Sequence, residues 1–385
     1  MDFKIDHELE MIRTTARNFV DDVLIPLEKQ VEEADAVPSE TMRRLRREAV
    51  KLGLYGYNMP AELGGPSLNT FAQTLIDEEV GRTTLALAES VRQLPLSLKY
   101  CTPEQCESLL PALMAGEKTI TYALTEPDAG SDLNALRTRA KRVDGGWMIN
   151  GRKQFISNAE TADYIILLTV TDPDAALNRG KLTTFLVERS NAGLKDFSRF
   201  KKMGWRGYHL NAFAIEDCFV PDRDVLGSVG NGFRSIMSSI NYDRLSVAGR
   251  CVGLAHRANE MSKKYATERT TFGAKLAEHQ AIQFMVADND VELEAARMLV
   301  YRAADFADNA HPDFRIAASR AKLYATEMLG RVADRSLQIF GGAGFMCDWP
   351  IERFYRDARA FRIGEGTSEM QRIQIARHVL AQAGA

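Results

Sequence analysis

Cysteine is scarce in this chain, and the cysteines that are present form no recognisable motif. Cys101, Cys106, Cys218, Cys251 and Cys347 are scattered along 385 residues without a CxxC pair. An odd number of cysteines without metal-ligand spacing argues against a zinc centre and against a disulfide framework. The pattern predicts reduced thiols, as in a cytoplasmic protein, and no metal site.

Long hydrophobic runs and an excess of charge of one sign are also lacking. No apolar run approaches the roughly 20 residues that span a bilayer. The N-terminal segment MDFKIDHELEMIRTTARNFV lacks the basic start and apolar core of a signal peptide. The formal net charge is only −3. We therefore expect no nucleic-acid partner and no membrane partner.

The composition is that of an ordinary globular protein, and the N-terminal third has helical spacing. Hydrophobic residues make up 45% and charged residues 26% of the chain, which is long enough for two or three domains. Apolar residues recur at helical intervals from residue 1 to about 117. The helices expected there lie at 39–53, 70–81, 86–100 and 103–113.

The hydrophobic period changes twice along the rest of the chain. From 118 to 227, short segments rich in β-branched and aromatic residues alternate with turns, including a hairpin turn at Asp144-Gly145-Gly146. Because no helical pattern separates these strands, the sheet should be mainly antiparallel. From 228 to 385 the helical period returns, which predicts an antiparallel bundle. The helices expected in it lie at 231–264, 277–308, 313–339, 349–359 and 368–382.

The predicted fold is therefore α+β and mostly α, with three domains. The expected division is an N-terminal helical domain (1–117), a middle antiparallel β domain (118–227) and a C-terminal four-helix bundle (228–385).

Glu365 is the first candidate functional residue. It lies between Gly364 and Gly366, and Ser368 and Gln371 have the S-x-x-Q spacing of a capping box, which predicts a helix start directly after it. Glycines allow other groups to approach the backbone closely, so Glu365 could face a ligand. The alternative is an ordinary solvated glutamate in a loop.

Four further motifs carry polar or glycine-rich chemistry, although none is specific alone. YALTEPDAGSD (Tyr122–Asp132) could cradle a heterocycle, or it could form a plain turn after a strand. ERTTFGAK (Glu268–Lys275) could bind a pyrophosphate through its guanidinium group, or it could be a polar connection between helices. QIFGGAGF (Gln338–Phe345) contains no GxGxxG and is not a dinucleotide fingerprint. In NYDR, Asn241 and Arg244 share a helical face and could hold one ligand.

Taken together and in this order, the motifs resemble those of the acyl-CoA dehydrogenase family. The resemblance covers essentially the whole chain through YALTEPDAGSD, GRKQFISNAETADY, NYDR, ERTTFG, QIFGGAGF and EGTSE. The family's fold, with a β domain between two helical domains, agrees with the predicted architecture. The resemblance implies an FAD-dependent enzyme.

The resemblance also implies where FAD would bind. Thr125 would bond the flavin ring, the strand around Phe155 would cover the flavin, and Ser131 would reach the acyl-CoA. A second group would contact the FAD of a neighbouring subunit, which implies a homotetramer built as a dimer of dimers. The implied cofactor-binding residues are Tyr122, Leu124, Thr125, Gly130, Ser131, Phe155, Ile156, Ser157, Arg269, Thr271, Phe272, Gln280, Gln338, Gly342, Thr367 and Glu369.

The implied reaction is α,β-dehydrogenation of an acyl-CoA thioester to a 2-enoyl-CoA. Glu365 matches the family's base, which removes the α-proton while the β-hydride moves to flavin N5, and an electron-transfer flavoprotein is the implied acceptor. Loss of water contact should raise the carboxyl pKa and make the base stronger. The implied substrate-binding residues are Ser131, Asn241, Arg244, Gly364, Glu365 and Gly366.

Several departures from the family pattern bear on the base and the substrate. Gly364 stands where many straight-chain members have tyrosine, which implies a short or medium acyl group that is branched, cyclic or otherwise bulky. Asp243 matches the position from which some members take their base, and it is the alternative to Glu365. Arg92 could bind a polar acyl tail, although a structural role is favoured. Phe155 replaces a common tryptophan, and Asn241 replaces a common aspartate.

Two other functions are compatible with the same fold. An oxidase or flavin-dependent monooxygenase would react with oxygen, and a non-catalytic binding protein would lack flavin. Because the chain has Glu365, Arg244 and all of the FAD motifs, the dehydrogenase is favoured over both.

Overall fold

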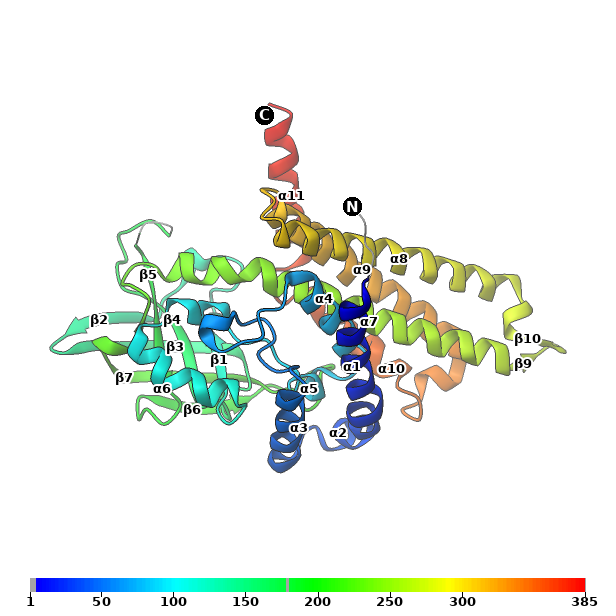
Figure 1. Cartoon of the computed structure of the whole chain (residues 1–385), viewed down its shortest axis with the longest axis horizontal. Helices are drawn as coiled ribbons and strands as arrows, with labels where there is room; N and C mark the ends of the chain where they lie inside the picture. The colour runs from blue at the N-terminus through cyan, green and yellow to red at the C-terminus, as the bar shows by residue number, and fades with distance from the viewer. Residues whose placement is uncertain (1–4, 178–179, 385) are drawn as a thin grey trace.

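The computed structural model describes residues 5–177 and 180–384 and shows two helical parts and a β-sheet (Figure 1). The sheet lies at one end of the long axis of the molecule, and the long helices of the C-terminal part extend toward the other end. The predicted α+β, mostly α architecture is confirmed. No helix in the described residues is long and apolar enough to cross a membrane.

The N-terminal part is helical, as predicted, with one exception. The expected helix at 86–100 is wrong, because the α-helix there ends at Ala88 and a short 3₁₀ turn follows only at Leu96. Pro95 between them has no N–H to continue a helix. The helices are α1 (His7–Phe19), α2 (Glu28–Ala34), α3 (Ser39–Lys51), α4 (Thr70–Val80), α5 (Leu85–Ala88) and α6 (Pro103–Met114).

The middle part is one eight-stranded sheet, mainly antiparallel. Its order is β6-β7-β3-β2-β4-β5-β8, with β1 paired in parallel to β4. The predicted hairpin turn is confirmed, since Val143 pairs with Gly146. Strands β6 and β8 were not predicted. The strands are β1 (Ile120–Ala123), β2 (Arg139–Val143), β3 (Gly146–Ser157), β4 (Tyr164–Val170), β5 (Leu182–Glu188), β6 (Leu194–Arg199), β7 (Leu210–Pro221) and β8 (Val225–Leu226).

The C-terminal part is built on three long helices, each of which runs back along the one before it, and two shorter helices (Figure 1). Small residues let α4 of the N-terminal part pack tightly on α7, where a Cβ added to Gly253 would lie 1.8 Å from the carbonyl oxygen of Glu78. The helices are α7 (Gly232–Glu268), α8 (Gln280–Asp308), α9 (Phe314–Phe340), α10 (Ile351–Phe361) and α11 (Ser368–Gln382), and β9 (Thr270–Thr271) and β10 (Ala274–Lys275) form a small hairpin.

Helix α7 connects the two ends of the molecule. Its 37 residues correspond to about 55 Å at 1.5 Å per residue. A Cβ at Gly232, where the helix begins, would lie within 3 Å of β5 backbone atoms, and the β9–β10 hairpin follows its last residue (Figure 1).

Helix α11 projects from the bundle (Figure 1). Several of its apolar side chains are exposed in a single chain. Ile373 is 41% and Leu380 is 56% exposed. The helix packs along one side on α9. An apolar helix face of this kind usually packs against another surface.

Candidate active site

Glu365 lies in a closed loop between α10 and α11. The amide of Ser368 donates a hydrogen bond to the carbonyl oxygen of Arg362 at 3.0 Å, which brings the two ends of the loop together. Glu365 has φ +52° and Gly366 has φ +87°. The left-handed region is unfavourable for a residue with a Cβ, so surrounding contacts must hold Glu365 there.

The start of α11 is correctly predicted, but its capping residues are different. The cap is Thr367, whose Oγ1 accepts a hydrogen bond from the Met370 amide at 3.3 Å. Ser368 instead donates to Glu327 at 2.7 Å, and the fully buried Gln371 donates to the Gly366 carbonyl at 2.9 Å. The capping box is therefore wrong, because Ser368 bonds a residue of α9 and Gln371 bonds the loop that precedes the helix.

Arg244 joins α7 to the Glu365 loop. Its Nε donates to the Glu365 carbonyl oxygen at 3.3 Å, and its Nη1 donates to Asn241 at 3.3 Å and to Gln374 at 3.2 Å. The predicted proximity of Asn241 and Arg244 is confirmed, and Arg244 is only 6% exposed. A Cβ on Gly366 would lie 3.4 Å from Arg244 Nη2 and 2.9 Å from Gln371 Nε2, so this close approach favours glycine.

Lys322 of α9 is a site residue that the sequence did not reveal. It is fully buried, and its Nζ donates to the Gly366 carbonyl oxygen at 2.8 Å. A lysine on the apolar face of a predicted helix is the signal that could have drawn attention to it, since fully buried lysines are rare.

The electrostatics make Glu365 a stronger base than an ordinary glutamate. Glu365 is an exposed residue in the single chain, yet the protein groups around its carboxyl displace part of its water and raise the pKa. The positive charges of Lys322 and Arg244 counteract part of that rise. A base with a pKa closer to neutrality accepts a proton more readily.

Asp243, the alternative base, is electrostatically coupled to Glu365. Burial raises the pKa of Asp243 well above that of an ordinary aspartate, and the negative charge of Glu365 raises it further. A hydrogen bond from Ser239 favours the ionised form of Asp243, but the pKa of Asp243 is still raised. Because the two carboxyls disfavour each other's ionisation, they titrate as a pair.

Tyr122 brings the predicted flavin cradle close to Asp243. Its hydroxyl shares a 2.8 Å hydrogen bond with Ser97. Burial raises the pKa of Tyr122, and the charge of Asp243 raises it further. The end of β1 and the Asn241–Arg244 segment of α7 therefore lie at one site.

The backbone after β1 is fixed by β3. Lys153 Nζ donates to the Leu124 carbonyl oxygen at 2.9 Å, and the Gln154 amide donates to that of Thr125 at 3.0 Å. The next residue, Phe155, has φ +56° at a bulge of β3 and is 51% exposed. The centroid of its ring lies 4.8 Å from the centroid of the Phe200 ring.

The rest of the predicted cradle follows from the same pairing. Ile156 is buried, and the carbonyl of Ser157 accepts a hydrogen bond from Thr121 at 2.8 Å. Gly130 and Ser131 lie in an exposed turn. A fixed backbone edge, several hydroxyls and an exposed aromatic ring are groups that fit a flat heterocycle with a phosphate-bearing tail.

Six other predicted cofactor residues lie at the far end of α7. Tyr265 near that end stacks on Phe340 at 4.2 Å between ring centroids, which brings the end of α9 beside the β9–β10 hairpin. Phe272 at the hairpin is 100% exposed. This group, Arg269, Thr271, Phe272, Gln280, Gln338 and Gly342, is separated from the β1–β3 cradle by most of the length of α7. One chain therefore does not place both groups around one ligand.

The remaining predicted residues differ in their surroundings. Glu369 is exposed on the first turn of α11. A Cβ added to Gly364 would find only the Ala360 carbonyl oxygen at 4.0 Å, so the space beside it is open. Arg92 donates to the Ile120 carbonyl oxygen at 2.7 Å and lies 3.3 Å from Glu89, so the structural role of this arginine is favoured.

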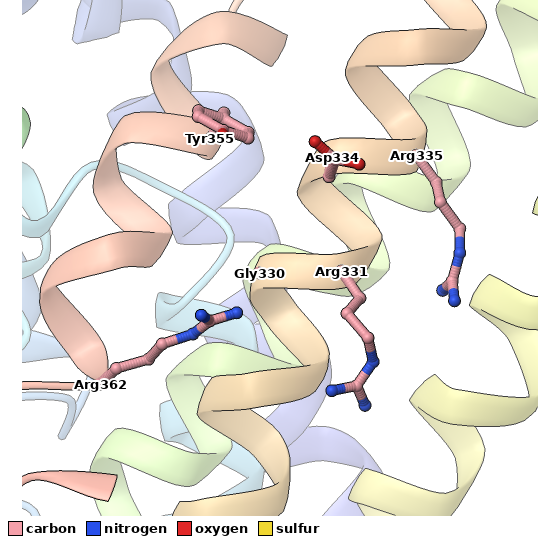
Figure 2. A pocket seen from close by; sticks show the side chains of 6 residues that line it. All are labelled: Gly330, Arg331, Asp334, Arg335, Tyr355 and Arg362. Atoms are coloured by element: carbon pink, nitrogen blue, oxygen red, sulfur yellow. The ribbon is translucent and has the colours of Figure 1, made fainter.

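The cavity between α9 and α10 shares only Arg362 with the Glu365 loop. The cavity has a volume of about 360 Å³, and Figure 2 shows the side chains that line it, which come from both helices and the end of α10. Its arginines are occupied, since Arg331 and Arg335 pair with Glu292 of α8 and Arg362 lies 3.4 Å from Glu327. The lining residues are Gly330, Arg331, Asp334, Arg335, Tyr355 and Arg362.

Comparison with protein families identifies the class to which this fold and site belong. The acyl-CoA dehydrogenase N-terminal, middle and C-terminal domains match residues 6–117, 121–218 and 230–380. The chain belongs to the acyl-CoA dehydrogenase family, and it is accordingly a flavoprotein oxidoreductase.

Individual relatives are similar over nearly their full length. A probable acyl-CoA dehydrogenase, YngJ, of Bacillus subtilis is 35% identical over 99% of this chain and 100% of its own. The human mitochondrial short-chain specific acyl-CoA dehydrogenase is 35% identical over 96% of this chain and 90% of its own. A glutaryl-coenzyme A dehydrogenase in complex with glutaryl-CoA has a TM-score of 0.92 and 31% identity, covering 99% of this chain and 97% of its own.

Proposed function

We propose that this protein is an FAD-dependent acyl-CoA dehydrogenase in which Glu365 is the catalytic base. The observation that carries the proposal is the position of Glu365, held at a left-handed φ beside the buried cations Arg244 and Lys322. A backbone in this unfavourable region is kept where function requires it. The predicted flavin cradle meets the same site at Tyr122.

The reaction takes a proton and a hydride from adjacent carbons of the acyl chain. Glu365 in its carboxylate form accepts the α-proton, and a double bond forms between Cα and Cβ as the β-hydride leaves. When bound, FAD supplies the two-electron acceptor for that hydride. The amide of Glu365 is available to donate to the thioester oxygen and so stabilise the negative charge that develops there.

Glu365 rather than Asp243 is the base in this proposal. Asp243 has the shorter side chain, and its pKa is raised both by burial and by the charge of Glu365. Asp243 therefore tends to hold a proton while Glu365 is ionised. The carboxyl of Glu365 also has two neighbouring cations that favour its ionised form.

The substrate follows from the open space beside Gly364. A tyrosine ring at this position would occupy space next to the base, whereas the glycine leaves room for a substituent on the acyl chain. We propose a short or medium acyl-CoA that is branched, cyclic or otherwise bulky. The structural contacts of Arg92 lend no support to a carboxylate at the end of the acyl chain.

We further propose that FAD is shared between subunits of a homotetramer, organised as a dimer of dimers. The two groups of cofactor residues lie near opposite ends of a helix of about 55 Å. A partner chain that supplied Phe272 and Gln338 to the β1–β3 cradle would complete the site. The exposed apolar residues of α11 provide surface for such an assembly.

Three other parts of the proposal come from the family resemblance and the composition. We propose an electron-transfer flavoprotein as the acceptor and a cytoplasmic location. We also retain the division into domains at 1–117, 118–227 and 228–385, which follows the change from helix to sheet and back to helix along the chain.

Anaerobic flavin bleaching tests the reaction. Purified protein should be yellow, and one member of a panel of branched, cyclic and straight acyl-CoAs should bleach its absorbance. Glu365→Gln should retain FAD but lose bleaching by a factor of about 10² or more, whereas Asp243→Asn should still be bleached. Normal bleaching of Glu365→Gln together with an inactive Asp243→Asn would assign the base to Asp243. Rapid peroxide formation in air would identify an oxidase instead.

A further inference from the structure

We propose that Lys322 is a positioning residue for the catalytic base: it anchors the loop through the Gly366 carbonyl and places a positive charge beside Glu365. This inference rests on the proposed role of Glu365. Lys322 acts through the loop and its charge and does not itself take part in proton transfer.

The first observation is the environment of Lys322, which differs from that of the other fully buried lysine. Lys153 is 1% exposed and forms a direct 2.8 Å ion pair with Glu126. Lys322 is 0% exposed, and within the described part of the chain no carboxylate oxygen lies within 4.0 Å of its Nζ. Burying an ammonium group without a direct counter-ion is costly, so its place in the fold calls for a compensating role.

The second observation is what the ammonium group holds. Its Nζ donates at 2.8 Å to the carbonyl oxygen of Gly366, the residue directly after the base. Gln371 donates to the same oxygen at 2.9 Å, while Arg244 donates to the preceding carbonyl, that of Glu365, at 3.3 Å. Donors from α7, α9 and α11 thus fix two consecutive peptide groups at the base.

Those two peptide groups are the ones that need support. Glu365 and Gly366 are both in the left-handed region, with φ of +52° and +87°. Without its anchor, Glu365 would relax toward the right-handed or extended conformations that a residue with a Cβ prefers. The carboxylate would then move relative to the α-carbon of a substrate, and proton transfer is sensitive to such displacements.

The positive charge of Lys322 also affects the ionisation of Glu365. Burial lowers the pKa of Lys322 to about 8, although the nearby Cys251 and Glu365 favour its charged form. Arg244 disfavours that form, and Glu327 on its own helix favours it. Lys322 is therefore mainly protonated at neutral pH. Its charge opposes the rise in the pKa of Glu365 that burial causes.

Two substitutions separate these contributions. Lys322→Met removes both the donor and the charge at similar length, whereas Lys322→Gln keeps an N–H donor without the charge. The control is Thr326→Val, one turn further along α9, which removes a hydrogen bond to the Lys322 carbonyl but leaves the Lys322 side chain unchanged. All three are compared as FAD-loaded proteins.

The assay measures removal of the α-proton without hydride transfer. A 3-thia-acyl-CoA has sulphur in place of the β-carbon, so its α-proton can leave but no β-hydride can. The bound enolate gives a long-wavelength absorption band beside oxidised flavin, and its pH dependence reports the ionisation of Glu365. We expect the rise of this band to occur at higher pH in both Lys322 variants, because Glu365 has lost a stabilising cation. Thr326→Val should follow the wild type.

Turnover provides the second measurement. We expect Lys322→Met to lower kcat by about tenfold or more with a change in KM of less than about threefold, since proton transfer is impaired and binding is not. Lys322→Gln should retain a larger share of kcat, because its amide can still bond the Gly366 carbonyl. FAD content per subunit should equal that of the wild type in each variant.

The outcomes separate this inference from the proposed function. If no acyl-CoA bleaches the wild type, the proposed function fails. If the wild type is bleached and Lys322→Gln retains FAD with a wild-type pH dependence of the enolate band, the inference is wrong. If Lys322→Met loses FAD, Lys322→Gln alone decides. If Thr326→Val shifts the band as far as the Lys322 variants, the effect belongs to α9 in general, and the inference is also wrong.

Discussion

Glu28→Gln should destabilise the protein strongly, because Glu28 is a buried carboxylate shared by two arginines. Glu28 of α2 is 4% exposed, and it lies 2.7 Å from Arg257 of α7 and 2.9 Å from Arg353 of α10. Thr83 donates to the same carboxylate at 3.0 Å. These contacts join the N-terminal helices to the helix that leads into the Glu365 loop.

The magnitude follows from what the substitution leaves behind. Glutamine has nearly the same shape, so little packing is lost. However, the two guanidinium groups stay buried without their counter-charge. Removing one partner of a buried ion pair costs about 3–5 kcal/mol. We expect the free energy of unfolding to fall by an amount in that range.

The contribution of Glu28 to the stability of the fold depends on pH with a definite sign. Burial alone would raise the pKa of Glu28, but Arg353 and Arg257 together lower it below the ordinary value of 4.5. A carboxyl whose pKa is lower in the folded state stabilises the fold above its unfolded pKa, and this contribution is lost as the pH falls through the folded value. The difference in the free energy of unfolding between the wild type and Glu28→Gln should therefore be largest at pH 7 and should shrink as the pH falls below 4.5.

The assay is urea unfolding of the FAD-loaded protein at fixed protein and FAD concentrations, followed by circular dichroism. The matched control is Glu33→Gln on the same helix. Glu33 lies 3.9 Å from Lys29, and both side chains are largely exposed. This control should change the stability by no more than about 0.5 kcal/mol. A loss below about 1 kcal/mol for Glu28→Gln, or an equal loss for Glu33→Gln, would refute the reasoning.

Three further predictions concern the site. Gly364→Tyr should fold normally, because the space at its Cβ is open, and should shift preference from branched toward straight acyl-CoAs, as kcat/KM across the panel would show. An unchanged ranking would contradict the proposed pocket. Phe272→Ala removes a fully exposed ring, so the fold should be unchanged by circular dichroism while the protein retains less FAD during gel filtration. A variant that retains as much FAD as the wild type would argue against a shared site. Turnover should rise with pH through a pKa above that of an ordinary glutamate, because burial raises the pKa of Glu365 and only its ionised form accepts a proton. A rise centred near pH 4 would exclude this.

Much of the fold could be predicted because its signals are local. Helices α7, α8, α9 and α11 begin and end within a few residues of the predicted bounds, since a long hydrophobic period lies within the helix itself. The same holds for β3 and its hairpin turn. Strand β6 was missed because most of its residues are polar and exposed. Strand β8 was missed because a strand of two residues shows no hydrophobic period.

The motifs of the site could also be located from the sequence, but their contacts could not. Asn241 and Arg244 are one helical turn apart, so their proximity is a local property. Ser368 and Gln371 have the spacing of a capping box, yet Ser368 bonds Glu327 and Gln371 bonds Gly366. A partner 41 positions away leaves no trace in the local pattern.

The sequence by itself determined the order of helix, sheet and helix, the place of Glu365 before a helix, and the family to which its motifs point. Each depends on residues that are close together in the chain. Only the tertiary structure decided that Glu365 lies at a left-handed φ, that Lys322 donates a hydrogen bond to the Gly366 carbonyl, and that the charge of Glu365 raises the pKa of Asp243. These properties depend on burial and on charges brought together from α7, α9 and the loop, and such distances exist only once the chain has folded.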